Sequence, residues 1–353
     1  EQDKARIVIG PRMNDAVTSA GAYLEPKGIL QACAICSSIS MTIGRKMGFD
    51  ITDTGVLEKH AMGAFINEPD DVLLKAGIDP SFLKGRKRAG FIGRDELYCV
   101  HGAYGWEEAL KKGGRGLQFQ FSDAVFYPFG TTDFAPYVSK LAEQKPDIIL
   151  LDVYVMPDML AIMQEMLKQG LDFETGKVVL LGNDVFSLPV FVEEAKKQGM
   201  NMSSGYCWGW QESNPSLGGG ETNSALDKPT LDRIAQFTPA YLTKFKGTEA
   251  EALEVSARGA FDMAMWLFFA IEKAGTITDN EKIAEAWKTS TLNGLRGPNQ
   301  HFFKRPDTGE ITGQLKVTEY IMRITNDKVS YTGIKYSDEL FYGPWVYGDK
   351  IPK

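Results

Sequence analysis

Short apolar runs alternate with amphipathic stretches along most of this chain, and that alternation constrains the fold more than any other feature of the sequence. The clearest example is the apolar run at residues 147–151, followed by residues 157–169 with apolar side chains at helical spacing and by a second apolar run at 178–181. Strands that alternate with helices form a parallel sheet, because each right-handed crossover packs its helix onto the sheet. The sequence therefore predicts the α/β class.

The same pattern predicts the remaining elements. Residues 41–84 are the least readable part, and residues 213–229, rich in Gly, Ser, Asn and Pro, predict a loop at a lobe boundary. The run at 318–324 suits an antiparallel or edge strand. Further strands are expected at 7–10, 29–34 and 88–93 and from 206 onward, and helices up to about 23 and at 106–112, 189–199, 231–245, 250–274 and 281–289.

Length and charge limit the classes of function. A chain of 353 residues suggests roughly two domains. The net charge of −7, without a stripe of Lys and Arg, argues against nucleic acid as a partner. No apolar run reaches the roughly eighteen residues that span a bilayer, so we expect no membrane insertion. A small molecule or another protein is the expected partner.

Motifs for catalysis and for cofactor binding are not found in the sequence. There is no Gly-x-Ser-x-Gly elbow, and His60, His101 and His301 stand in unrelated contexts. No Gly-x-Gly-x-x-Gly follows a predicted strand, and Gly218–Gly220 lacks the Lys-Ser/Thr of a phosphate-binding loop. We therefore expect a protein that is not an enzyme and holds no cofactor.

Residues that directly follow the predicted strands form a candidate binding site. Open α/β sheets bind ligands at the carboxyl ends of their strands. Hydroxyls, one acid and several aromatic rings can bind an organic molecule, and no activated nucleophile is among them. A Tyr or Trp near a strand end is more often a packing residue, so the hypothesis depends on the whole set. The set comprises Asn14, Cys36, Ser37, Tyr104, Tyr154, Asp184, Phe186, Trp208 and Trp210.

Several segments resemble type I periplasmic binding proteins of the branched-chain amino acid class. Phe129–Phe134 (FGTTDF), followed by Lys145–Asp147 before an apolar strand, is the most specific part. Asp3–Pro11, Gly28–Ser38 and Leu181–Asp184 support the resemblance by their order and spacing. The similarity covers most of the chain.

The resemblance implies two Rossmann-like, doubly wound α/β lobes that are joined by three crossovers and close over a ligand in the cleft. Members of the family usually deliver their ligand to an ABC transporter permease, which implies a periplasmic or extracellular protein that is a monomer or a weak dimer. We expect lobe 1 at residues 1–67 and 212–312, lobe 2 at 68–211 and 313–353, and crossings near Phe65–Asn67, Gln211–Pro215 and Gly309–Gly313.

The resemblance also assigns roles to individual residues. Asn14 replaces a family Ser that contacts the ligand, and the Cys36–Ser37 pair replaces an Ala-Thr pair that holds the ligand carboxylate. Tyr104 matches a tyrosine of the second lobe, and Asp184 matches an acid that often faces the ligand amine.

Two departures from the family pattern stand out. Phe65–Asp71 reads FINEPDD where the family often has FRTxPSD, so an Arg that contacts anionic ligands is replaced. The family's opening strand–helix units have no counterpart before Asp3–Pro11, which predicts that lobe 1 lacks roughly two strands of its sheet.

The leading hypothesis is a binding protein for a small organic solute with an apolar or aromatic body, either an acid or an amino acid. Aromatic walls pack well against planar ligands. A branched-chain amino acid is the plain family expectation. The rings that motivate the aromatic hypothesis are Trp106, Tyr154, Phe186, Trp208 and Trp210.

Two alternatives remain open. The first is a cytoplasmic or membrane-associated sensor that uses the same clamp. The second is a metal site, because Cys36, Cys99, His101 and Cys207 all fall near predicted strand ends and thiolate and imidazole suit Zn²⁺. Buried thiols that act as small hydrophobes are far more common. Separately, Cys33 and Cys36 would form a disulfide in an oxidising compartment.

Overall fold

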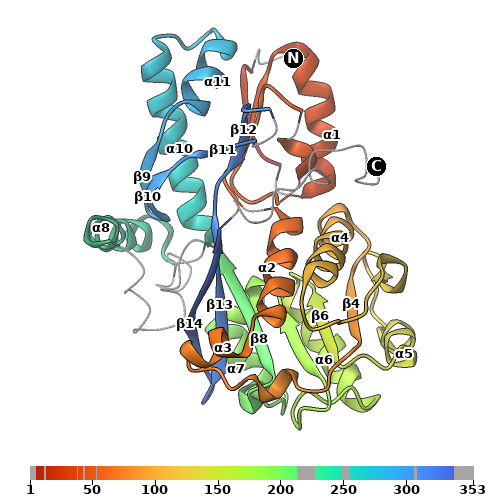
Figure 1. Cartoon of the computed structure of the whole chain (residues 1–353). Helices are drawn as coiled ribbons and strands as arrows, with labels where there is room; N and C mark the ends of the chain where they lie inside the picture. Colours follow the sequence, from red (N-terminus) through yellow and green to blue (C-terminus); the bar gives the residue numbers. More distant parts are fainter. Residues whose placement is uncertain are drawn as a thin grey trace. The chain divides into compact units, whose positions relative to one another are not determined.

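The computed structural model of the 353-residue chain describes residues 5–11, 13–37, 39–42, 44–52, 54–212, 227–247, 255–305 and 308–337. The chain divides into two compact units (Figure 1). Unit 1 comprises Glu1–Thr54, Asn223–Thr318 and Ser337–Lys353, and unit 2 comprises Gly55–Thr222 and Glu319–Tyr336.

Unit 1 contains a five-stranded sheet in the order β1-β2-β3-β12-β11, with β1 at one edge. Its first four strands in that order are parallel, and β11 runs antiparallel to β12. β9 and β10 form a separate antiparallel pair. The strands are β1 (Ile7–Ile9), β2 (Leu30–Cys33), β3 (Gly48–Asp50), β9 (Leu292–Gly294), β10 (Gly297–Gln300), β11 (Phe302–Lys304) and β12 (Ile311–Leu315).

Helices cover both faces of the unit 1 sheet. α1 (Asn14–Leu24) covers one face, where Val17 packs on the strand that carries Cys33. α10 (Val255–Ala274) and α11 (Asn280–Lys288) cover the other face, and α8 (Lys228–Phe245) precedes them in the chain. The core is aromatic: the Phe49 ring of β3 stacks on Trp287 at 4.4 Å between ring centroids.

Unit 2 contains a seven-stranded sheet in the order β14-β13-β8-β7-β6-β4-β5 (Figure 1). The five strands from β8 to β5 are parallel, and β13 joins β8 in antiparallel fashion, as expected for the run at 318–324. The strands are β4 (Ala89–Arg94), β5 (Val125–Tyr127), β6 (Ile148–Asp152), β7 (Val179–Gly182), β8 (Cys207–Glu212), β13 (Thr318–Thr325) and β14 (Lys328–Ser337).

Three helices of unit 2 have a proline in their first turn. Proline lies in the first turns of α5, α6 and α7, where its missing N–H has no helical partner to lose. These three helices bury apolar side chains against one face of the sheet. The helices are α2 (Gly55–Asn67), α3 (Asp70–Lys75), α4 (Leu97–Lys112), α5 (Ala135–Glu143), α6 (Met156–Lys168) and α7 (Pro189–Lys197).

α2 and α4 pack at very short range, because small residues line their contact. A Cβ atom on Gly105 would lie 2.2 Å from the carbonyl oxygen of Val56, and one on Gly63 would lie 2.4 Å from the Cβ of Ala109. Such distances leave no room for a side chain. Glycine at these positions therefore sets the spacing of the two helices.

The predicted strands at 7–10, 29–34, 88–93, 147–151 and 178–181 are confirmed. One helix prediction was wrong in its start: α4 begins at Leu97, not at Trp106, because tertiary packing keeps Gly102 and Gly105 helical despite their low propensity. The pattern also gave no sign of β3 and α2, which lie within the unreadable residues 41–84, or of β5 and α5.

The compact units divide at Thr54 and Thr318, whereas the expected lobe boundaries are residues 67 and 312. Phe65–Asn67 ends α2, which packs on α4 of unit 2, and β12 pairs with β3 of unit 1. Most of the expected boundary loop at 213–229 lies outside the described residues, and its last two residues, Lys228 and Pro229, begin α8.

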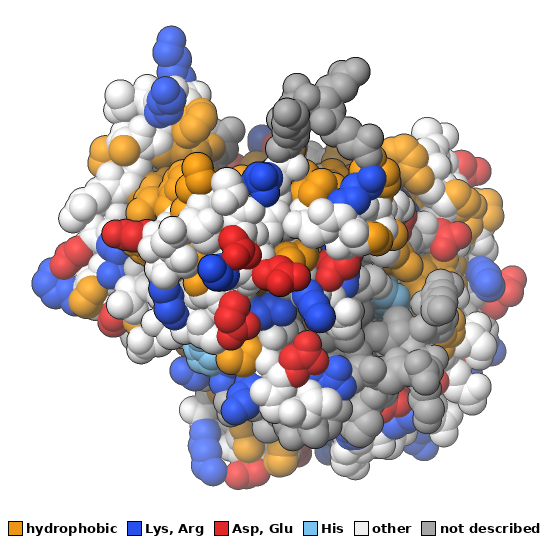
Figure 2. Space-filling model, turned by 90° about the horizontal axis from the view of Figure 1, so that it is seen from above, with side chains coloured by type: hydrophobic (Ala, Val, Ile, Leu, Met, Phe, Trp, Pro, Cys, Tyr) orange, Lys and Arg blue, Asp and Glu red, His pale blue; other side chains and the backbone are white. Residues whose placement is uncertain are grey.

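In the view of Figure 2, acidic and basic side chains lie scattered among uncharged and hydrophobic ones. Within the described ranges, no helix is both long enough and apolar enough to cross a membrane.

We predict that Gly105→Ala destabilises the protein by about 1–3 kcal/mol, because the new methyl group must displace the backbone of α2. Gly114→Ala is the matched control, since a Cβ atom there meets open space, and we expect it to change stability by less than about 0.5 kcal/mol. Urea unfolding measures both, and equal stability of the two variants would refute the close packing.

Candidate functional site

The carboxyl ends of the parallel strands form one polar edge in each unit. Parallel strands end on the same side of their sheet, and ligands of α/β proteins bind there. In unit 1 this edge follows β1, β2 and β3, and in unit 2 it follows β4, β6 and β7. The two edges are described separately below.

Asn14, Cys36 and Ser37 lie where the sequence places them, at the carboxyl edge of unit 1. Asn14 is the first residue of α1, after β1, and its side chain is buried. Its Oδ1 atom has no hydrogen-bond partner among the described residues. Cys36 and Ser37 follow β2, with Cys36 buried and Ser37 half-buried.

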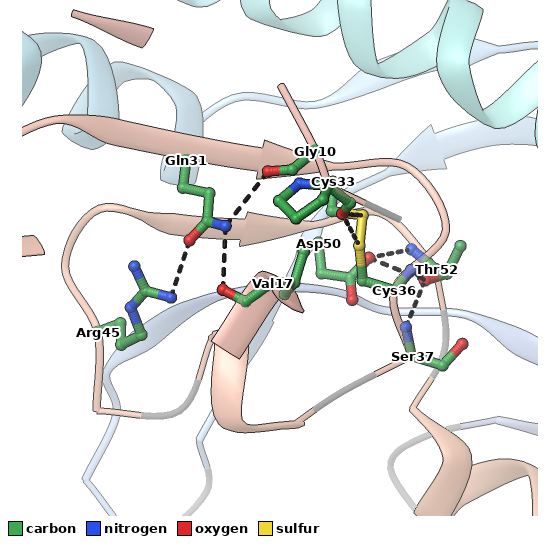
Figure 3. Close-up of a disulfide and its surroundings, with 10 residues drawn as sticks. Gly10, Val17, Gln31, Cys33, Cys36, Ser37, Arg45, Asp50 and Thr52 are labelled. Atoms are coloured by element: carbon green, nitrogen blue, oxygen red, sulfur yellow. Dashed lines mark hydrogen bonds between the residues drawn. A yellow bond between two sulfur atoms is a disulfide. The ribbon is translucent and has the colours of Figure 1, made fainter. Parts of the chain in front are cut away.

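Cys33 and Cys36 are joined by a disulfide (Figure 3), as the sequence suggests for an oxidising compartment. The bridge connects the last residue of β2 to the loop that follows, across 5.9 Å between the Cα atoms. The two sulfur atoms lie 3.4 and 3.3 Å from the carbonyl oxygen of Pro11, which follows β1. The disulfide therefore sits between the ends of two neighbouring strands.

Thr52 connects this loop to the end of β3. Its Oγ1 atom accepts hydrogen bonds from the backbone N–H groups of Cys36 and Ser37, both at 3.3 Å (Figure 3). The same hydroxyl donates to Oδ1 of Asp50 at 2.8 Å. Asp50 is fully buried, and burial raises its pKa to about 7 although Thr52 and the Arg296 charge act in the opposite direction.

A lysine lies at the centre of the carboxyl edge of unit 2. Lys59 of α2 is fully buried, and its ammonium group contacts the carboxylate of Glu58 and lies 3.1 Å from Oδ1 of Asp152, at the end of β6. It also lies 3.4 Å from the ring centroid of Tyr98, whose hydroxyl donates to Glu58. Burial alone would lower the pKa of Lys59, but the Asp152 and Glu58 carboxylates outweigh it and raise the pKa.

Tyr154, a predicted site residue after β6, belongs to a second polar group on this edge. Its hydroxyl donates to Oε2 of Glu96 at 2.7 Å, and Arg94 donates to the same oxygen at 2.8 Å. The Arg94 guanidinium lies 4.5 Å from the Tyr154 ring centroid. Tyr154 also meets Tyr98 edge to face at 5.8 Å, which links this group to the one around Lys59.

The other predicted residues of unit 2 lie in varied surroundings. Tyr104 is in the middle of α4, where it stacks on Phe121 at 3.8 Å between ring centroids. Asp184 is half-buried in a 3₁₀ turn after β7. Phe186 packs on Phe191, and Trp106 is fully buried in α4. The placement of Trp208 and Trp210 after a strand was wrong, because both lie within β8. Trp208 packs on Phe65 and Phe82, and Trp210 lies 5.7 Å from the Lys59 ammonium group.

Sequence reasoning missed several residues of both edges. Tyr98 occupies the strand-end position that was assigned to Tyr104, because the start of α4 was placed too late. The charged run Arg94–Glu96 directly after a predicted strand was a usable signal. The signals for Asp50, Thr52, Glu58 and Lys59 lay in the unreadable residues 41–84.

In the part of the chain that the structure describes, no three His, Cys, Asp or Glu side chains lie close enough together to hold a metal ion. Cys36 is bonded to Cys33 and has no thiolate to offer. Cys99 and Cys207 are free but buried, and burial raises the pKa of each thiol. His101 is buried in α4.

We predict that Lys59→Met destabilises the protein by about 3–5 kcal/mol, because two buried carboxylates lose their countercharge. Lys168→Met removes an exposed ion pair with Glu165 and is expected to cost less than about 0.5 kcal/mol. Chemical unfolding compares the two variants. A Lys59 variant as stable as the control would show that Lys59 is not the countercharge of the two buried carboxylates.

We also predict that Asp50 makes stability depend on pH. Because its pKa is about 7 in the folded protein and about 4 when unfolded, the folded state binds the extra proton between these values. The contribution of Asp50 to the free energy of unfolding is full below about pH 4. It is lost as pH rises to about 7, by up to about 1.4 kcal/mol per pH unit. Asp50→Asn should therefore gain stability relative to the unmodified protein from pH 5 to pH 8. A constant difference in unfolding free energy would exclude this titration.

Solved structures of binding proteins share this fold. A leucine-binding protein, LivK, from Thermotoga maritima is 18% identical with a TM-score of 0.70, covering 96% of this chain and 82% of its own. A solute-binding protein of an ABC transporter from R. palustris, solved with 4-hydroxybenzoate, is 16% identical with a TM-score of 0.69, covering 96% and 80%. LivJ from Streptococcus pneumoniae, solved with isoleucine, is 17% identical with a TM-score of 0.64, covering 95% and 80%.

No curated protein is similar enough in sequence to count as a match. The family model described as periplasmic binding protein matches residues 1–328, which is most of the chain. This match agrees with the two α/β units and supports the prediction of a binding protein rather than an enzyme. The chain belongs to the periplasmic binding protein family.

Proposed function

We propose that this protein is the solute-binding component of an ABC transporter and that its ligand is a small organic acid or amino acid. The observation that carries the proposal is the linked set of charged and aromatic side chains at the carboxyl edge of unit 2. Arg94, Glu96, Tyr98 and Tyr154 contact one another there, at the strand ends where α/β proteins bind ligands.

The chemistry of this edge suits the proposed ligand class. Arg94 and Glu96 bring one charge of each sign, which fits a carboxylate or a zwitterion. Tyr98, Tyr154 and the exposed ring of Phe129 supply flat apolar surface for the body of the solute. Relatives with this fold were solved with isoleucine and with 4-hydroxybenzoate, and both kinds of molecule belong in the first test.

The carboxyl edge of unit 1 is the second proposed source of ligand contacts. Asn14 follows β1, and its buried Oδ1 atom has no hydrogen-bond partner among the described residues. Ser37 is half-buried and follows β2, the strand that pairs with β1. A ligand that supplies a donor for Asn14 would relieve the cost of a buried acceptor without a partner. We therefore include Asn14 among the proposed ligand-binding residues.

A periplasmic or extracellular location is part of the proposal. The Cys33–Cys36 disulfide supports it, because disulfides persist in oxidising compartments and are rare in the cytosol. Delivery to an ABC permease follows from the family resemblance, and we expect the protein to act as a monomer or a weak dimer.

We predict that Tyr154→Phe weakens solute binding by about fivefold to tenfold, since it removes the hydroxyl that orders Glu96. Tyr331→Phe is the matched control and should bind like the unmodified protein, because Tyr331 lies on β14, packs on Tyr320 and belongs to neither carboxyl edge. Calorimetric titration with leucine, isoleucine, benzoate and 4-hydroxybenzoate identifies the ligand and compares the variants. Equal affinity of both variants would count against a role for the unit 2 edge.

A further inference from the structure

We propose that the Cys33–Cys36 disulfide positions the solute-binding loop of unit 1, so that the oxidation state of this pair sets the affinity for solute. The closed disulfide holds the backbone N–H groups of Cys36 and Ser37 in one fixed arrangement (Figure 3). The inference rests on the proposed function, in which this edge contacts the solute, and it adds a redox requirement to it.

The loop adopts a backbone conformation that needs support. Ser37 has φ of 37°, in the left-handed region that non-glycine residues seldom occupy. Such a conformation is costly for a residue other than glycine and persists only where the surroundings enforce it. Ser37 directly follows the bridged Cys36, so the disulfide constrains the chain at the entry to this turn.

Thr52 holds the same turn from the other side. Its Oγ1 atom accepts both loop N–H groups, and its position is fixed in turn because its own N–H and hydroxyl both donate to Oδ1 of Asp50, at 3.1 and 2.8 Å. The side chain of Gln314 donates to the Thr52 carbonyl. The disulfide and Thr52 together determine which groups of the loop remain for a ligand.

Opening the disulfide changes this geometry. A dithiol reductant gives up two electrons and two protons, the S–S bond breaks, and two thiols form while the reductant closes its own disulfide. The unbonded sulfur atoms must move apart to van der Waals contact. Cys33 and Cys36 are only 3% and 1% exposed and lie against the Pro11 carbonyl, so Cys36 and the attached loop must shift to make room.

Burial also determines when the pair reacts. Thiol–disulfide exchange requires access to a sulfur atom, and the folded protein covers both. The disulfide is therefore set during folding in an oxidising compartment and then resists reduction. A chain that folds with the pair reduced has the same sequence but a released loop and a weaker site.

The test compares the oxidised protein with the Cys33→Ser/Cys36→Ser double variant. Two readouts are needed: hydrogen exchange of the Cys36 and Ser37 amides, and calorimetric affinity for the solute that the ligand panel identifies. We expect exchange at these amides to rise at least tenfold and affinity to fall about tenfold. Cys207→Ala, which removes a buried thiol of unit 2, is the control and should change neither.

A Thr52 pair separates positioning from a general loss of stability. Thr52→Ser keeps the hydroxyl and should retain both loop protection and affinity, whereas Thr52→Val should reproduce the effect of the double serine variant. A double variant that melts earlier but keeps its amide protection and affinity would overturn the proposal. If the oxidised protein binds no solute, the proposed function fails, and amide exchange still decides whether the disulfide positions the loop.

Discussion

The buried ammonium group of Lys59 is the interaction on which the carboxyl edge of unit 2 depends. It comes from α2, its countercharge at Asp152 ends β6, and the ring above it belongs to Tyr98 of α4. An isolated buried charge is prohibitively costly, so these elements must meet for the unit to fold. Glycine at position 102 makes this possible, since a Cβ atom there would lie 2.9 Å from Oδ2 of Asp152 and 3.1 Å from Lys59.

Unit 1 also has a buried ionisable group at a strand end, but this group is an acid that can become neutral, and a disulfide lies beside it. Asp50 is buried at the end of β3, and its raised pKa lets it shed its charge near neutral pH, whereas Lys59 keeps its own charge through two carboxylates. The disulfide then ties the neighbouring strand end to its loop. In both units, polar groups buried at strand ends order the backbone before any ligand arrives, which lowers the entropy cost of binding.

The sequence predicted the repeating part of this architecture and missed its exceptions. Strands such as Ile148–Asp152 were found because parallel strands buried on both faces read as continuous apolar runs. α4 was placed nine residues too late, because Gly102 and Gly105 resemble loop residues until their packing partner is known. Local propensity cannot anticipate a helix that is stabilised by close approach to another helix.

The candidate site was predictable only in part, for a similar reason. Asn14, Cys36, Ser37 and Tyr154 follow predicted strands and lie at the carboxyl edges. Lys59 and Glu58 reach the edge from the start of a helix, within a stretch that shows little amphipathic pattern because nearly all of α2 is buried. Phe186 follows β7 equally well, yet its ring packs on Phe191. Trp208 and Trp210 were placed after a strand but lie within β8, because the sequence pattern marked only the start of that strand.

Native mass spectrometry of the purified protein tests the central claim most directly, because a solute-binding protein often retains its ligand. We expect a species heavier by one small organic molecule, which denaturation releases as an amino acid or an aromatic acid. A protein that is empty, and whose melting temperature is also unchanged by leucine, isoleucine, benzoate and 4-hydroxybenzoate, would contradict the account.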